Sequence, residues 1–147
     1  MTEIQALLLI KSILESADIH GIENILAEDC EYMSTGRGII GRNRNESIEF
    51  LSSMTESIKA DNVPVTCKVM HITDVYEEDA LFHEGRHGLT VSYESGDNYV
   101  YMIFVDVNDE GLVDRIVSSQ ENYSIEYDDL RFGDDESEYA FISAPTT

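Results

Sequence analysis

The stretch ADIHGIENILAEDCEYMSTGRGIIGRNRNESIEFL, residues 17–51, changes its local pattern several times and indicates a small α+β unit. Asp18 is a favoured N-cap residue, and the apolar residues that follow it predict a short helix over 19–26. Residues 28–33 predict a short extended segment, and the glycines that follow mark a loop. A longer helix is predicted over 44–60, where apolar residues recur at helical spacing.

The residues before this stretch predict another helix. Their apolar positions recur at a spacing that places them on one helical face: Ala6, Leu7, Ile10, Ile13, Leu14 and Ala17. Three N-terminal helices are therefore expected.

After Asn62 the hydrophobic period changes to two. Residues 65–75 alternate between apolar and more polar side chains, which is typical of a strand. Further strands are predicted over 80–93, 98–107 and 112–119, with turns at 76–79, 94–97 and 108–111. Strands joined by such short turns form an antiparallel meander.

The composition indicates one acidic globular domain. The chain has 147 residues, 42% of them hydrophobic, which is enough to build a core. Nine basic residues against 30 acidic ones give a formal net charge of −21. Such a surface repels nucleic acid and anionic membranes and attracts a basic protein or a cation, although solubility alone also accounts for it.

Other features of the sequence predict the cellular location and the character of the C-terminal segment. The sequence shows neither an apolar run of spanning length nor a signal peptide, and Cys30 and Cys67 read as free buried thiols, so a cytoplasmic protein is expected. Residues 124–147 form an acidic tail after a domain that covers residues 1–123. Within the tail, the apolar residues 139–142 either dock back or add a strand.

The segment HEGRH, residues 83–87, matches the H-E-x-x-H pattern of zinc proteases. That site requires a helix, which brings both histidines to one metal ion. Here Gly85 and Gly88 disfavour a helix, and the flanking residues favour a strand. Two histidines four residues apart on a strand are separated by about 13 Å, so they cannot share a zinc ion. No metal site is expected.

If this segment is a strand, its histidines form the polar end of an otherwise apolar strand face. His83 and His87 share a face with Leu89, and His71 lies on the preceding predicted strand. His71 faces His83 if the turn has an odd number of residues, and it faces Glu84 if the turn has two. The histidines either line a pocket or are satisfied by backbone and carboxylate partners in the core.

Residues 17–51 and a later segment, GDNYVYMIFVDVNDEGLVDRIVSSQENY (96–123), resemble the nuclear transport factor 2-like superfamily, also called SnoaL-like or cystatin-like. The resemblance rests on the small helix, the acidic EDCEY segment, the glycine-rich loop, the start of the long helix and the final hairpin. It implies an α+β fold in which three N-terminal helices pack on a curved antiparallel sheet of four to six strands, a cone-shaped barrel. It also implies a pocket in the cone and a homodimer formed through the sheet.

Enzymes of this superfamily include ketosteroid isomerase, polyketide cyclases and scytalone dehydratase. The resemblance places Ser34 where the isomerase has its aspartate base and Ile10 where it has its oxyanion tyrosine. Serine cannot take a proton from a weak carbon acid, and isoleucine donates no hydrogen bond, so that chemistry is not expected. The remaining candidate catalytic residues are His83, Asp106 and Asp29.

Two functional hypotheses remain. The first is a SnoaL-like protein that binds a small apolar ligand in its cone, without a recognisable catalytic set; as an enzyme it would be an isomerase, cyclase or dehydratase without a cofactor. The candidate ligand-binding residues are Tyr32, His71, His83, His87 and Tyr101. The second is an acidic protein-interaction module, such as an immunity or inhibitor protein for a basic toxin. Neither hypothesis involves nucleic acid or a membrane.

Overall fold

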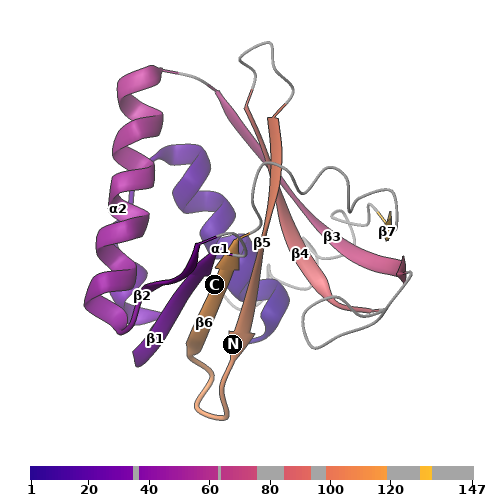
Figure 1. Cartoon of the computed structure of the whole chain (residues 1–147), viewed down its shortest axis with the longest axis horizontal. Coiled ribbons are helices and arrows are strands. Elements are labelled where there is room, and N and C mark those ends of the chain that lie inside the picture. Colours follow the sequence, from indigo (N-terminus) through magenta and orange to yellow (C-terminus); the bar gives the residue numbers. More distant parts are fainter. Residues whose placement is uncertain (35–36, 63, 76–84, 94–98, 119–129, 134–147) are drawn as a thin grey trace.

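The computed structural model describes residues 1–34, 37–62, 64–75, 85–93, 99–118 and 130–133 (Figure 1). These residues form two α-helices, one short 3-10 helix and a single sheet. None of the described helices has the length and apolarity needed to cross a bilayer.

The first helix, α1, covers Glu3–Ser16 and begins at a capping box. Thr2 accepts a hydrogen bond from the Gln5 backbone N–H, and the Gln5 side chain accepts one from the Thr2 backbone. The helix ends at Ala17, which adopts a left-handed conformation with φ 55°. The predicted apolar face is confirmed, because Ala6, Leu7, Ile10, Ile13 and Leu14 are all buried.

The second predicted helix is wrong in type and length. In place of a helix over 19–26, the structure has a single 3-10 turn, η1, at Ile22–Asn24. Gly21 begins the turn with φ 88°, a conformation that does not propagate an α-helix. Leu26 already belongs to the first strand. The described residues therefore form two α-helices where three were expected.

The long helix, α2, covers Arg44–Asp61, close to its predicted bounds. Its N-cap is Asn43, whose side chain accepts a hydrogen bond from the Glu46 backbone N–H at 2.9 Å. Asn62 ends the helix in a left-handed conformation with φ 50°.

The sheet has the strand order β2-β1-β6-β5-β4-β3-β7. Its strands are β1 (Leu26–Ser34), β2 (Gly38–Gly41), β3 (Val65–Val75), β4 (His87–Tyr93), β5 (Tyr99–Val107), β6 (Val113–Ser118) and β7 (Leu130–Gly133). The meander β3–β6 is antiparallel as predicted, but β1 pairs with β6 in parallel, so the sheet is mixed. β2 forms where a loop was expected, and β7 comes from the predicted acidic tail. Residues 80–84 of the predicted second strand lie outside the described residues.

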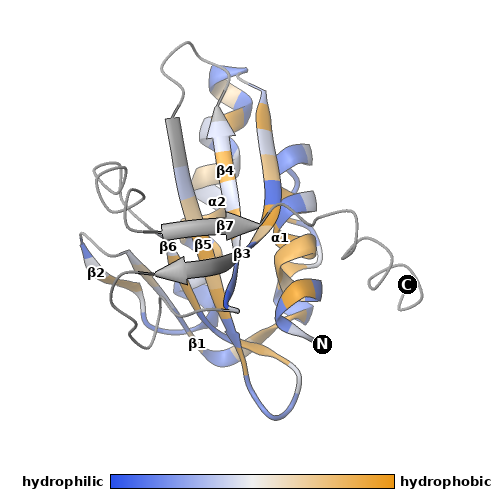
Figure 2. Cartoon of the chain, turned by 90° about the vertical axis from the view of Figure 1, so that its right-hand side faces the viewer, coloured by the Kyte–Doolittle hydropathy of each residue, from blue (hydrophilic) through white to orange (hydrophobic). Residues whose placement is uncertain are grey.

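The two helices cover one face of the sheet. Figure 1 shows α1 behind β5 and β6 and α2 along the side of β1 and β2, and Figure 2 shows apolar residues along much of α1. The residues between the helices and the sheet form one core, which includes Leu7, Ile10, Leu14, Tyr32, Leu51, Cys67, Val69, Leu89, Val91, Ile103, Val105 and Ile116. Both cysteines are free and buried, as predicted.

Candidate functional site

The sheet face opposite the helices, called the outer face here, carries a row of charged residues. Glu31 of β1 pairs in register with Arg115 of β6, and Arg115 pairs in register with Asp106 of β5. Register partners lie on the same face of a sheet. Their neighbours along the chain, such as Tyr32 and Ile116, belong to the core, so this row faces away from the helices.

A β-bulge adds a further carboxylate to this row. Arg115 pairs with Asp106 while Val113 pairs with Val107, so Asp114 is the extra residue of β6. A bulge changes the direction in which the neighbouring side chains point. Asp114 and Arg115 consequently both line the same hollow on the outer face.

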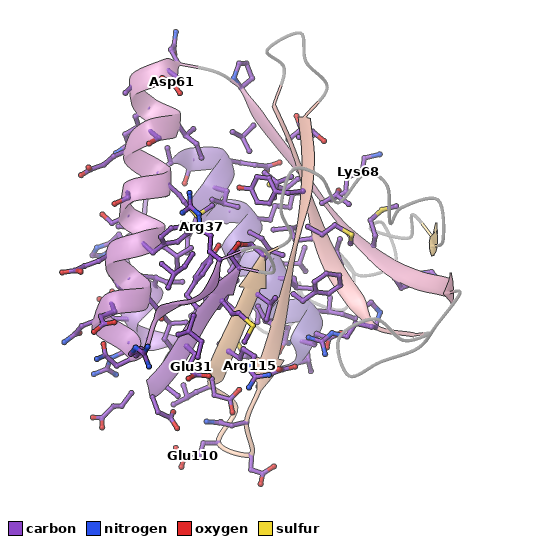
Figure 3. All side chains as sticks on the ribbon, viewed as in Figure 1. Glu31, Arg37, Asp61, Lys68, Glu110 and Arg115 are labelled. Carbon is purple, nitrogen blue, oxygen red and sulfur yellow. The ribbon has the colours of Figure 1, made fainter. Side chains whose placement is uncertain are left out.

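This hollow, called the acidic groove here, has a volume of about 500 Å³. It is lined by Asp29, Glu31, Arg42, Asp106, Asp114 and Arg115. Figure 3 shows Glu31 and Arg115 side by side near the ends of β1 and β6, and their charged atoms are 3.9 Å apart. Four carboxylates therefore share the groove with two guanidinium groups.

The electrostatics of the groove are dominated by the carboxylates. Desolvation, together with the negative charges of Asp106 and Asp29, raises the pKa of Asp114 above its ordinary value. Desolvation and Asp114 also raise the pKa of the neighbouring buried Cys30 thiol to about 12. The acidic groove thus disfavours additional negative charge and favours an incoming cation.

Asp106 has a strong partner inside the protein. Arg86 Nη2 lies 3.0 Å from Asp106 Oδ1 and donates a hydrogen bond to the Val105 carbonyl at 3.1 Å. The Arg86 side chain is only 7% exposed, and its guanidinium carbon lies 5.6 Å from the centre of the Phe104 ring. Arg86 therefore neutralises Asp106 from within the fold.

Glu3 attaches the first turn of α1 to the residues of the HEGRH segment. Its Oε1 accepts hydrogen bonds from the His87 backbone N–H at 2.9 Å and from His87 Nδ1 at 3.0 Å. Its Oε2 lies 3.9 Å from Arg86 Nε. Burial acts to raise the pKa of Glu3, but the two His87 bonds and the Arg86 charge outweigh it, so this pKa lies below its ordinary value.

The strand prediction is confirmed for His87, and the predicted register of His71 is corrected. His87 begins β4, and its register partner is His71, with ring centres 6.2 Å apart. Neither predicted partner of His71, His83 or Glu84, occupies that place, because the register of β3 and β4 sets His71 opposite His87. His83 itself lies outside the described residues. In the part of the chain that is described, no three His, Cys, Asp or Glu residues gather as metal ligands.

The two tyrosines predicted to line a pocket are core residues. Tyr32 has no exposed surface, and its ring lies 4.6 Å from the Phe50 ring while its hydroxyl contacts Met54 Sδ at 3.6 Å. Tyr101 is 8% exposed. A side chain with no accessible surface touches no water-sized space, so Tyr32 borders no open cavity.

The positions that the family resemblance assigns to isomerase chemistry are also buried. Ile10 is 1% exposed in the core, and Ser34, at the end of β1, is 3% exposed. Neither supplies a base or an oxyanion donor in this fold.

Of the predicted catalytic candidates, Asp106 and Asp29 both line the acidic groove. Sequence reasoning did not single out Glu3, Arg86 or Asp114. Arg86 had a detectable signal, since it is a charged residue inside a segment with strand-forming flanks. Asp114 and Arg115 interrupt the apolar residues of β6, whereas nothing local marks Glu3, whose partners are more than eighty residues away.

No protein-family model matches the sequence, and no curated protein matches it. Solved structures match by fold. An uncharacterised protein with a cystatin-like fold from Silicibacter pomeroyi aligns with a TM-score of 0.54 and 13% identity, covering 86% of this chain and 94% of its own. An LEH-like epoxide hydrolase from M. tuberculosis aligns with a TM-score of 0.50 and 17% identity, covering 82% and 84%. An NTF2-like protein of unknown function from Cytophaga hutchinsonii has a TM-score of 0.49 and 12% identity, covering 80% and 98%.

The predicted resemblance is confirmed at the level of the fold. The chain has a cystatin-like fold, which the structure from Silicibacter pomeroyi shares. At these identities the likeness concerns the fold alone, since one such fold supports many unrelated functions.

Proposed function

We propose that this protein binds a basic protein partner through the acidic groove, as an inhibitor or immunity protein would. The observation that carries the proposal is the composition of the groove, in which four carboxylates face two guanidinium groups in a chain of net charge −21. Glu31 lies beside Arg115, and Asp106 pairs with Arg86. Asp29 and Asp114 are the carboxylates left to receive a partner.

The raised pKa of Asp114 supports this assignment. Burial and the nearby charges of Asp106 and Asp29 destabilise the charged form of Asp114, and a bound guanidinium or ammonium group stabilises it. Charged grooves of this kind also speed association with an oppositely charged partner, an effect that falls steeply with salt.

The packing of the cone interior also supports a site on the outer face. Ile10, Leu14, Leu51, Leu89 and Ile103 are each at most 1% exposed, as is Tyr32. Side chains buried to this degree are closely packed by their neighbours, so these described residues border no open ligand space. Among the described residues, the acidic groove, which is lined by charged groups, lies on the outer face.

The test compares two double variants of equal charge. Asp29→Asn with Asp114→Asn removes two charges from the groove, and Glu49→Gln with Glu56→Gln removes two exposed charges from α2. Binding of an octa-arginine peptide is measured by calorimetry at low and at physiological salt. We expect the groove variant to lose about tenfold or more in affinity, since charge pairs at interfaces carry 1.4 kcal/mol or more.

The control variant separates a defined site from general attraction. If both variants weaken binding equally, the peptide is attracted by net charge alone and the proposal fails. If the groove variant binds as tightly as the unmodified protein, the groove is not the binding site.

A second candidate function is a small-molecule site beside His87. The supporting observation is that three titratable side chains gather here: Glu3 Oε1 lies 3.0 Å from His87 Nδ1, and the His71 and His87 ring centres lie 6.2 Å apart. One similar fold belongs to an LEH-like epoxide hydrolase, which is a small-molecule enzyme. Incubation with a simple epoxide such as styrene oxide tests this candidate, because turnover that His87→Ala abolishes supports it and absence of turnover counts against it.

A further inference from the structure

β2 lies at one end of the sheet, and its outer edge is open. β1 pairs with one side of the strand, and the strand order ends at β2. No described residue donates or accepts a hydrogen bond along the other side. Ile39 is 40% exposed, so the strand also presents apolar surface. The unused N–H and C=O groups of an edge strand are a template on which a further strand can pair.

Arginines lie at both ends of this strand. Arg37 comes immediately before β2, Arg42 immediately after it, and Arg44 begins α2. Residues 37–44 thus hold three of the nine basic residues of the chain. None of the three forms an ion pair with a described residue, although the chain has 30 acidic side chains. Their positive charges are therefore available to a partner.

The charges near this edge decide what it attracts, although the whole chain is strongly acidic. Beyond the Debye length of about 8 Å at physiological ionic strength, exposed charges are largely screened. Arg37 and Arg44 do not line the acidic groove, and Figure 3 shows Arg37 well separated from Glu31. Glu46, the first acidic residue after the arginines, accepts a hydrogen bond from the Arg42 backbone N–H at 3.1 Å, which closes the start of α2. Three arginines against this one carboxylate make the local charge of the β2 edge positive.

We propose that the outer edge of β2 is a docking site for an extended acidic segment of a partner protein, which adds a strand beside Gly38–Gly41. The β2 backbone supplies the hydrogen bonds, and Ile39 supplies an apolar contact. Arg37 and Arg42 are five residues apart, about 16 Å along a strand, so they lie at opposite ends of the docked segment. Carboxylates about five residues apart, with β-branched residues between them, match this edge.

A second copy of this chain does not suit the edge. If two β2 strands paired antiparallel about a two-fold axis, Arg37 of one copy would lie opposite Arg42 of the other, and like charges directly opposite are destabilising. The partner proposed for the acidic groove is basic, so the two surfaces take partners of opposite charge. The inference is therefore independent of the proposed function, and either can fail alone.

Fluorescence anisotropy with labelled synthetic peptides and the full chain tests the proposal. The probe peptide carries two glutamates at each end and four alternating valine and threonine residues between them. The control peptide has glutamines in place of the glutamates. At physiological salt we expect the glutamate peptide to bind about fivefold or more tightly than the control, because several exposed charge pairs act together. A glutamate peptide with proline at its centre lacks a donor for the ladder and should bind as weakly as the control.

Two double variants of equal charge locate the site. Arg37→Gln with Arg44→Gln removes two charges at the β2 edge and should weaken binding of the glutamate peptide about fivefold. Lys59→Gln with Lys68→Gln removes two charges elsewhere and should leave binding unchanged. In hydrogen exchange, the bound peptide should slow the exchange of amides in residues 38–41. The proposal is overturned if the glutamate peptide does not bind, if both double variants weaken binding equally, or if residues 38–41 exchange as fast with the peptide as without it.

Discussion

At the scale of single residues, Gly88 shows how tightly the outer face is packed. A Cβ atom at this position would lie 2.7 Å from both Met102 Cε and Phe104 Cε1. Gly88 lies in β4 next to His87, and its lack of a side chain lets these two large residues lie over the strand. In the sequence this glycine indicated only that the segment was not a helix.

Gly88→Ala should destabilise the fold by about 1–3 kcal/mol, because the added methyl group overpacks a filled site. Chemical denaturation measures the change in the free energy of unfolding. Phe104→Leu in the same chain should recover part of the loss by making room for the methyl group. A double-mutant cycle without such coupling would show that the crowding at Gly88 has another origin.

The HEGRH segment shows what could be predicted at this scale. Its glycines and strand-forming flanks predicted a strand in place of a helix, and His87 begins one. The partners of its residues could not be predicted, because Glu3 and Asp106 reach Arg86 and His87 from distant parts of the chain. The local sequence indicates secondary-structure propensity. These side-chain pairs depend instead on how the fold brings the helix and the strands together.

At the scale of elements, Glu3 links α1 to the sheet through its hydrogen bonds with His87. The folded-state pKa of Glu3 lies below its ordinary value of 4.5. A carboxylate with a lowered pKa contributes stability that is fully present above 4.5 and is lost as the pH falls through the folded-state value. Because Glu3 lies in the first turn of α1, the helix dipole also favours its negative charge.

Glu3→Gln should therefore lower the free energy of unfolding by about 1–2 kcal/mol at pH 7, since hydrogen bonds to a charged group are lost. The difference between the two proteins should stay constant from pH 7 to pH 5 and shrink below pH 4.5. Urea unfolding across this range measures it. A difference that grew on acidification would contradict the lowered pKa.

The elements also show where sequence reasoning succeeded and failed. Strong alternation predicted β3 closely, and apolar residues at helical spacing did the same for α2. The helix expected over 19–26 failed because Gly21 restricted it to one turn. β2 could not be predicted, because its glycines indicate a loop, and only the neighbouring β1 makes Gly38–Gly41 a strand.

At the scale of the whole molecule, the net charge of −21 opposes folding through self-repulsion. Salt screens this repulsion, and its screening length falls from about 10 Å at 0.1 M to about 3 Å at 1 M. We expect the melting temperature to rise when sodium chloride is increased from 0.01 to 0.5 M. Calorimetry measures the shift, and a melting temperature that falls with salt would show that attractive pairs such as Arg86–Asp106 outweigh the repulsion.

The parallel pairing of β1 with β6 has a consequence for synthesis on the ribosome. Glu31 of β1 leaves the ribosome early, but its register partner Arg115 is synthesised more than eighty residues later. Until then one side of β1 has no strand to bond to, and the hairpins of the meander form first because they are local. β1 therefore stays unpaired on this side until β6 has been synthesised. A chaperone that shields an unpaired strand would act in this interval.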